Sequence, residues 1–155
     1  MLLLTSGLRA QTVSEAIWST AAQRWVSYAE LVQTLRAADL VFLGEQHDNQ
    51  AHHETRARLV ADLSRPGLTL VFEQLPAQGR FTIPPQEPDL LTVLRVQGFQ
   101  EKAWAWPMHA PLFAVAQRLA IPLSGGNIQS GLGRRVYAEG PQALPIEIQQ
   151  ALASA

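Results

Sequence analysis

The chain has 155 residues, of which 47% are apolar and 16% charged, and its formal net charge is −1 at pH 7. This is the size and composition of one globular domain and excludes a wholly disordered chain. No apolar run approaches the roughly 18 residues that span a bilayer, and the balanced charge excludes a generally basic, nucleic-acid-binding surface. The lack of cysteine excludes disulfides, thiolate metal sites and thiol nucleophiles.

The chain begins with an amino terminus that shows no regular pattern, and the first predicted helix follows it. The apolar run that opens residues 1–16 is too short for a secretory signal, so we expect a flexible terminus or the remnant of a signal that begins upstream. Export of the chain is left open by this stretch. Ser27 and Glu30 have the spacing of a capping box, which predicts a helix reaching about Ala38.

Three short apolar runs predict strands. Residues 40–43 end at Gly44, residues 68–72 end at Glu73, and residues 121–123 run into Gly125. Between and after them, amphipathic periodicity predicts helices over residues 49–63, 89–96, 112–119, 130–138 and 145–153, with a proline-rich loop over 76–88. The alternation of strands and helices predicts an α/β fold with a mainly parallel sheet flanked by helices.

Polar residues follow each of these apolar runs. In parallel sheets, ligands usually bind beyond the carboxyl ends of the strands, so the residues after Leu43 and after Val71 are expected to share one pocket. Glu45 and His47 follow the first run, and Glu73 follows the second. His52 and His53 lie on the next helix, each four residues after a polar residue, at Asp48 and Asn49.

Imidazole and carboxylate groups at this density indicate a ligand site. A metal ion could be held by His47, His52 or His53 together with Glu45 or Glu73. The arrangement is not the His-Glu-x-x-His motif of metalloproteases, because no second histidine follows His53-Glu54 at the required spacing. The alternative interpretation is a polar junction in which one histidine satisfies buried backbone groups and the others are solvated.

The motif over residues 44–53 resembles the signature of the ChaN-like haem-binding proteins, which belong to a wider group with the TIKI and TraB proteins and the erythromycin esterases. The resemblance is carried by Gly44-Glu45-Gln46-His47-Asp48-Asn49 with His52-His53, and it is supported by residues 25–31, 71–75, 104–111, 126–127 and 134–136. It covers about residues 17–146 and is most specific in the 44–53 motif.

The resemblance implies a three-layer α/β sandwich with a small helical excursion over residues 17–155. It also implies haem binding linked to iron uptake at the bacterial envelope, in the periplasm for an exported chain, and members are often lipoproteins. Family members carry further carboxy-terminal segments, so we expect this domain to be partial. A homodimer with a shared site would complete such a domain.

Haem needs an apolar slot, an axial ligand and partners for its propionates. His109 and His47 are the candidate iron ligands, and Glu45 and Glu73 are expected to orient a histidine rather than to bind iron. The slot candidates are Trp104, Trp106, Met108 and Phe113, and the propionate candidates are Arg56, Arg58, Arg134 and Arg135. The alternative role of each aromatic residue is packing in the core. The alternative for Arg58 is a place on a solvent-exposed helix face.

Three functions are consistent with these features. The first is a non-catalytic haem-binding protein. The second is a metal-dependent hydrolase of the erythromycin-esterase or TIKI type, with a divalent metal as cofactor and Glu45 or Glu73 as general base. The third is an incomplete domain without independent activity. The chain has no Gly-x-Ser-x-Gly nucleophile motif, which counts against a serine hydrolase.

Overall fold

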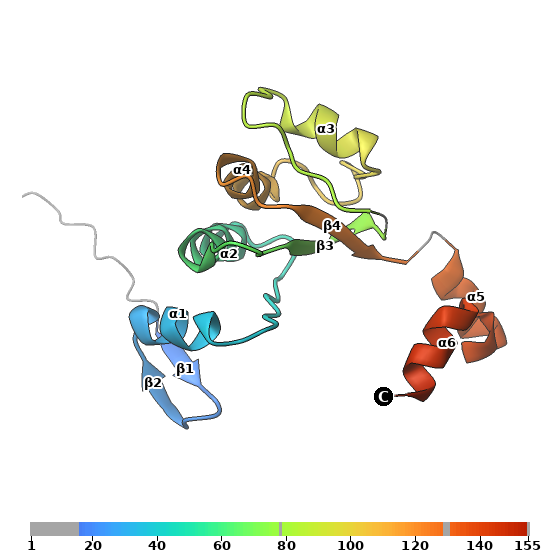
Figure 1. The fold of residues 1–155 in the computed structure, drawn as a ribbon, viewed down its shortest axis with the longest axis horizontal. Helices are drawn as coiled ribbons and strands as arrows, with labels where there is room; N and C mark the ends of the chain where they lie inside the picture. Colours follow the sequence, from blue (N-terminus) through green and yellow to red (C-terminus); the bar gives the residue numbers. More distant parts are fainter. Residues whose placement is uncertain (1–15, 78, 129–130, 155) are drawn as a thin grey trace, which may run out of the picture. The chain divides into compact units, whose positions relative to one another are not determined.

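The computed structural model describes residues 16–77, 79–128 and 131–154 (Figure 1). Contacts divide the chain into two compact units, residues 1–41 and residues 42–155. Nearly all of the predicted flexible terminus lies outside the described residues.

The first unit contains a β-hairpin that the sequence patterns did not predict, followed by the predicted helix. Strands β1 (Ile17–Ser19) and β2 (Arg24–Val26) pair antiparallel, and the rings of Trp18 and Trp25 meet edge to face with centroids 5.2 Å apart. Helix α1 (Tyr28–Arg36) begins with the predicted capping box. The Glu30 amide donates to the Ser27 hydroxyl over 3.2 Å, and the Ser27 amide donates to the Glu30 carboxylate over 2.8 Å.

The second unit holds the remaining elements. They are α2 (Gln50–Leu63), β3 (Leu70–Pro76), α3 (Leu90–Val96), α4 (Ala110–Arg118), β4 (Leu123–Asn127), α5 (Leu132–Glu139), the 3-10 turn η1 (Pro141–Ala143) and α6 (Ile146–Ala153). The five helices predicted after residue 48 are all present, with ends shifted by one or two residues. The mixed α/β composition is therefore confirmed, whereas the three-layer sandwich stays a prediction.

Strands β3 and β4 form a parallel pair, as expected for strands joined by a helical crossover. Leu70 lies opposite Leu123 and Phe72 opposite Gly125. A Cβ atom on Gly125 would lie 1.9 Å from the carbonyl oxygen of Pro76, so only glycine lets the end of β3 approach β4 this closely. The register shifts between Phe72 and Pro76, and this irregular stretch carries Gln74, which reaches the polar cluster described below.

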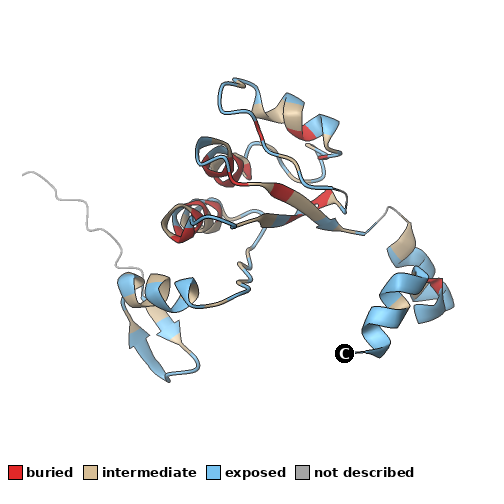
Figure 2. Ribbon diagram, in the orientation of Figure 1, coloured by how far each residue is buried: buried red, intermediate tan, exposed pale blue. Residues whose placement is uncertain are grey.

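The core of this unit joins the helices α2, α3 and α4 to the sheet, and Figure 2 shows the buried segments concentrated there. The rings of Phe72 and Phe113 stack with centroids 4.3 Å apart, and Phe99 meets Phe113 edge to face at 5.7 Å. Trp106 and Trp104 are partly buried against this core. Helices α2 and α4 pack against each other, which fixes the positions of side chains that stand some 50 residues apart in sequence.

The prediction of a strand over residues 40–43 is wrong. These residues have no regular secondary structure, and Phe42 is 87% exposed. A central strand needs hydrogen-bonding neighbours and apolar cover on both faces, and an apolar run alone supplies neither. Only Leu43 packs against the core, so the segment acts as an irregular approach to Glu45.

None of the described helices combines the length and the apolar character that crossing a membrane would require.

Candidate functional site

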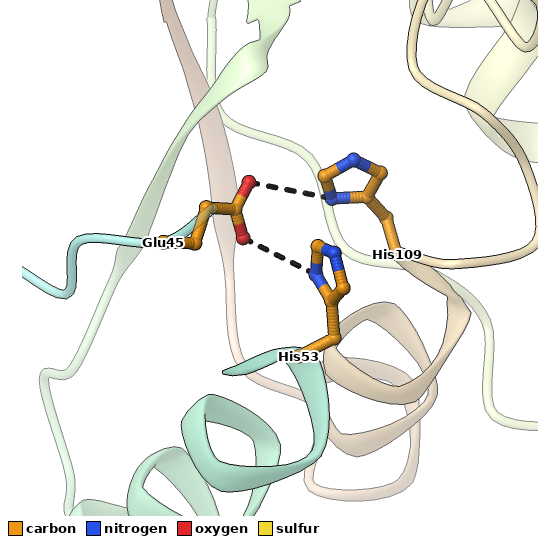
Figure 3. A group of neighbouring side chains, drawn as sticks. All are labelled: Glu45, His53 and His109. Atoms are coloured by element: carbon orange, nitrogen blue, oxygen red, sulfur yellow. Dashed lines mark ion pairs between the residues drawn. The ribbon is translucent and has the colours of Figure 1, made fainter. Parts of the chain in front are cut away.

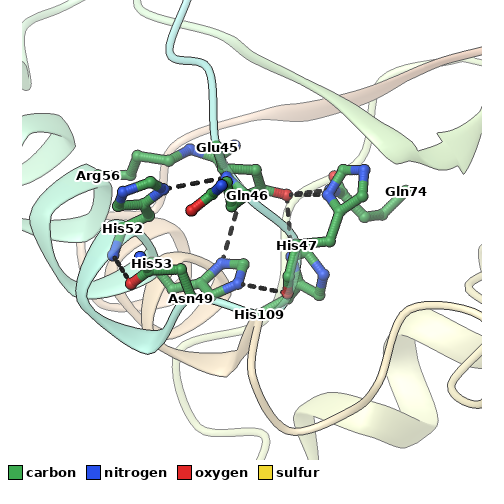
Figure 4. A network of polar contacts seen from close by, with 9 residues as sticks. All are labelled: Glu45, Gln46, His47, Asn49, His52, His53, Arg56, Gln74 and His109. Atoms are coloured by element: carbon green, nitrogen blue, oxygen red, sulfur yellow. Dashed lines mark hydrogen bonds and ion pairs between the residues drawn. The ribbon is translucent and has the colours of Figure 1, made fainter.

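Glu45 is the centre of a polar cluster in the second unit (Figure 4). Its side chain is only 5% exposed. The amide of Gln74 donates to Oε1 over 3.0 Å, and Nδ1 of His47 lies 2.9 Å from the same oxygen. The other oxygen, Oε2, contacts the guanidinium of Arg56. A buried carboxylate is costly unless it is paired and hydrogen-bonded, and here both conditions are met.

Helix α2 delivers two of these partners from one face. His53 and Arg56 stand three residues apart and therefore project to the same side of the helix. Asn49 caps the helix by accepting a hydrogen bond from the His52 amide over 3.3 Å. This cap fixes where the first turn starts, and hence where His53 points.

His53 is completely buried, and each nitrogen of its ring lies next to an oxygen atom. Its Nε2 lies 3.0 Å from the carbonyl oxygen of His47, and its Nδ1 lies 3.2 Å from Oε2 of Glu45. Because a carbonyl oxygen can only accept, Nε2 must carry the proton. The ring of His53 therefore presents Nδ1 to the carboxylate of Glu45.

His109 reaches the same carboxylate from the start of α4, as Figure 3 shows. Its side chain is 3% exposed, its Nδ1 lies 3.7 Å from Oε1 of Glu45, and its ring meets that of His53 with centroids 4.4 Å apart. Burial is the main cause that lowers the pKa of His109 to about 4, and His53, Arg56 and His47 lower it further. The ring is therefore neutral at pH 7.

Arg56 supplies the positive charge of the cluster. Its side chain is 14% exposed. Burial lowers the pKa of the guanidinium, and the negative charge of Glu73 partly opposes that shift. Arginine nevertheless stays charged at neutral pH, so Glu45 and Arg56 form a nearly buried ion pair. A haem propionate could use Arg56 only by competing with Glu45.

Other residues predicted from the sequence lie around this cluster. His47 is the exposed member, with a side chain 56% exposed and its ring edge to face with Trp104 at 5.2 Å. Nδ1 of His52 accepts a hydrogen bond from the backbone N–H of Gln46 over 3.0 Å. Glu73 is exposed on β3, and Trp106 packs edge to face with Phe99 at 5.8 Å.

The sequence analysis missed Gln74. Neighbouring side chains of a strand point to opposite faces, so Gln74 faces the core with Phe72 while Glu73 faces out. Gln74 is 4% exposed and Glu73 is exposed. A strict alternation argument applied to residues 72–74 would have selected Gln74 as the residue that meets Glu45.

Two open hollows lie elsewhere in the second unit. One of about 680 Å³ is lined by residues of α5 and η1, including Arg134 and Arg135, and one of about 420 Å³ is lined by residues 64–69, Arg80 and 119–122. Neither is lined by a histidine. The cluster around Glu45 is thus the described place where imidazole and carboxylate groups converge.

The fold and this cluster define a class: a mixed α/β domain with an acid–imidazole group next to the end of a parallel strand. The family described as haem-binding uptake, Tiki superfamily, ChaN, matches residues 31–155. Because the match covers most of the chain, the protein belongs to this family, and the resemblance noted from residues 44–53 is confirmed. Neither a curated protein nor a solved structure matches the chain significantly.

Proposed function

We propose that this protein binds haem through His47 and serves haem uptake at the bacterial envelope. The observation that carries the proposal is an exposed imidazole backed by a buried carboxylate. The side chain of His47 is 56% exposed, whereas that of Glu45, 2.9 Å from its Nδ1, is 5% exposed. Membership of a haem-binding uptake family supports haem as the ligand.

The contact with Glu45 decides which nitrogen of His47 is available. Oε1 of Glu45 accepts the Gln74 amide and Oε2 contacts the Arg56 guanidinium, which favours an ionised carboxylate. An ionised carboxylate can only accept, so Nδ1 of His47 donates to it. The lone pair of His47 is then on Nε2, and the carboxylate makes that nitrogen a better ligand.

Accessibility favours His47 over His109 as the haem ligand. Haem, when bound, supplies an iron that takes an imidazole nitrogen as axial ligand. The porphyrin is a wide, flat ring, whereas the side chain of His109 is 3% exposed and its ring contacts those of Trp104 and His53. His47 presents its ring at the surface, and the partly buried Trp104 provides an aromatic edge beside it. A second copy of the chain covering the other haem face is part of this proposal.

The test is a titration of the purified protein with haemin, followed through the Soret band. We expect a saturable shift, and His47→Ala should weaken binding at least tenfold because the iron–imidazole bond is lost. Tyr137→Phe is the control, since Tyr137 is 95% exposed on α5 and its phenol is the competing type of ligand.

Two results would count against the proposal. The absence of saturable binding by the wild-type protein would remove haem as the ligand. Unchanged affinity in His47→Ala with a loss in Tyr137→Phe would move the axial ligand from the histidine to the tyrosine. Circular dichroism of each variant shows whether the fold is intact.

A further inference from the structure

We propose that Glu45, His53 and His109 hold a bare divalent transition-metal ion, in a buried site separate from the haem at His47. One ligand atom from each of the three residues can be chosen so that all lie within 4.8 Å of one another (Figure 3). All three side chains are at least nine-tenths buried, at 5%, 1% and 3% exposure. This inference goes beyond haem binding and does not depend on it.

The first argument comes from His53. Its Nε2 carries the proton because it faces the carbonyl oxygen of His47 at 3.0 Å. In the neutral ring, Nδ1 then carries a lone pair, and this lone pair faces Oε2 of Glu45 at 3.2 Å. Nδ1 is buried without a hydrogen-bond partner, whereas Oε2 also contacts the Arg56 guanidinium. In the neutral ring, the lone pair of Nδ1 therefore faces a carboxylate oxygen, and a cation bound between them would relieve this contact.

The hydrogen bond between Nε2 of His53 and the carbonyl oxygen of His47 is of the kind that metal-binding histidines make. Such histidines usually donate their second ring N–H to a backbone carbonyl or a carboxylate, which fixes the ring and its tautomer. His53 does this through the carbonyl of His47, and Asn49 fixes the start of the helix that carries it. The orientation of Nδ1 is therefore already determined by the fold.

The distances fit a single small ion. Ligand atoms about 2.1 Å from a common tetrahedral centre lie roughly 3.4 Å from one another. Nδ1 of His53 lies 3.2 Å from Oε2 of Glu45, and Nδ1 of His109 lies 3.7 Å from the other oxygen, Oε1, so both imidazoles are close enough to share an ion with this carboxylate. The cluster does not fit a porphyrin, because its three side chains are at most 5% exposed and a wide, flat ring could not reach their ligand atoms.

The ligand set indicates which ions bind. Two imidazoles and one carboxylate favour zinc, iron(II) or cobalt(II) over magnesium and calcium, which prefer oxygen ligands. Three protein ligands leave the fourth position of a tetrahedral ion open, as in catalytic zinc sites, but the burial of all three residues leaves little access for substrate. The site is therefore expected to stabilise the junction of α2 and α4 rather than to activate a hydrolytic water.

The charge of Arg56 is expected to weaken metal binding, and a variant without this charge tests that expectation. Its guanidinium contacts the same carboxylate oxygen that faces His53, so it opposes a second positive charge there. Replacing Arg56 by glutamine removes the competing charge without removing a ligand. We expect Arg56→Gln to bind the metal at least tenfold more tightly than the wild type.

The untagged, metal-free chain of 155 residues is titrated with zinc chloride against a chromophoric chelator. A second titration uses cobalt chloride and follows its visible absorption bands. We expect one equivalent to bind with a dissociation constant in the micromolar range or below. His53→Gln, His109→Asn and Glu45→Gln should each weaken binding at least tenfold. His52→Asn, which removes an imidazole outside the group, should bind as the wild type does.

Two results would overturn the proposal. The first is failure of the wild-type protein to bind one equivalent of zinc or cobalt. The second is an equal loss of metal binding in His52→Asn and His53→Gln. The rise of the melting temperature with added zinc, measured for each variant, shows that a variant is folded and whether the ion stabilises it. Metal binding retained in His47→Ala, alongside lost haemin binding, supports separate sites, whereas joint loss overturns their separation.

Discussion

Replacing Glu45 tests whether its buried carboxylate holds this cluster together. Glu45→Gln keeps the size of the side chain and removes its charge. Arg56, 14% exposed, is then left without its counter-ion. The interactions of Glu45 with His53 and His109 change at the same time.

The expected loss of stability follows from the burial of the Glu45–Arg56 ion pair. Removing one partner of a buried ion pair costs about 3–5 kcal/mol, and the residual exposure of Arg56 favours the lower end, about 3 kcal/mol. For a chain of this length, that loss lowers the melting temperature by roughly 6–12 °C. Removing both charges should cost less than the sum of the single changes, with a coupling of about 2 kcal/mol.

The assay is urea unfolding of Glu45→Gln, Arg56→Gln and the double variant, followed by circular dichroism in buffer with a chelator. The chelator removes any stabilisation by bound metal. Glu54→Gln is the matched control, because Glu54 is an exposed carboxylate on α2, the helix that carries Arg56, and it accepts a hydrogen bond from the nearby Gln50. Its effect should stay within about 0.5 kcal/mol.

Strict additivity of the two single changes would refute this reasoning. So would a stability loss in Glu45→Gln no larger than that in Glu54→Gln. Either result would mean that the Glu45–Arg56 pair is solvated in solution and does not organise the imidazoles around it.

Two further outcomes are expected. The pKa of His109 is lowered from 6.5 to about 4, so the unfolded chain binds more protons than the folded chain between these two pH values. The free energy of unfolding should therefore be highest above pH 6.5 and should fall by up to about 3 kcal/mol as the pH drops to 4. Urea unfolding at pH 7 and pH 5 measures this slope, and His109→Asn should flatten it; an unchanged slope would assign it to another group. Asn49→Ala should destabilise α2 by about 1 kcal/mol while Asn49→Asp keeps the cap, measured by thermal unfolding, and equal losses in both would show that the cap contributes nothing.

The helices were predicted well because the residues that start a helix lie next to it in the sequence. The capping box at Ser27 and the cap at Asn49 both mark helix starts that the structure contains. The run at residues 40–43 had equally clear apolar character, yet it forms no strand. A strand is defined by its neighbours, and composition does not reveal whether a neighbour is present.

The cluster was predictable in its residue types but not in its geometry. The density of acidic and imidazole groups after Gly44 marked the right segment. The sequence could not show that His53 is fully buried while His47 is exposed, because burial depends on α4 packing against α2. It also could not show which nitrogen of His53 is free, since the carbonyl of His47 decides that through a contact made only in the folded chain.

The two proposed sites meet at one carboxylate. Oε1 of Glu45 faces the exposed ring of His47, and Oε2 faces the buried ring of His53. A side chain held from both sides can rotate only if one contact is lost, so the orientation of the exposed imidazole depends on what occupies the buried side. Gln74 reinforces this from β3 by donating to Oε1. The motif after Gly44 therefore acts as a unit, in which the buried residues position the exposed imidazole of His47.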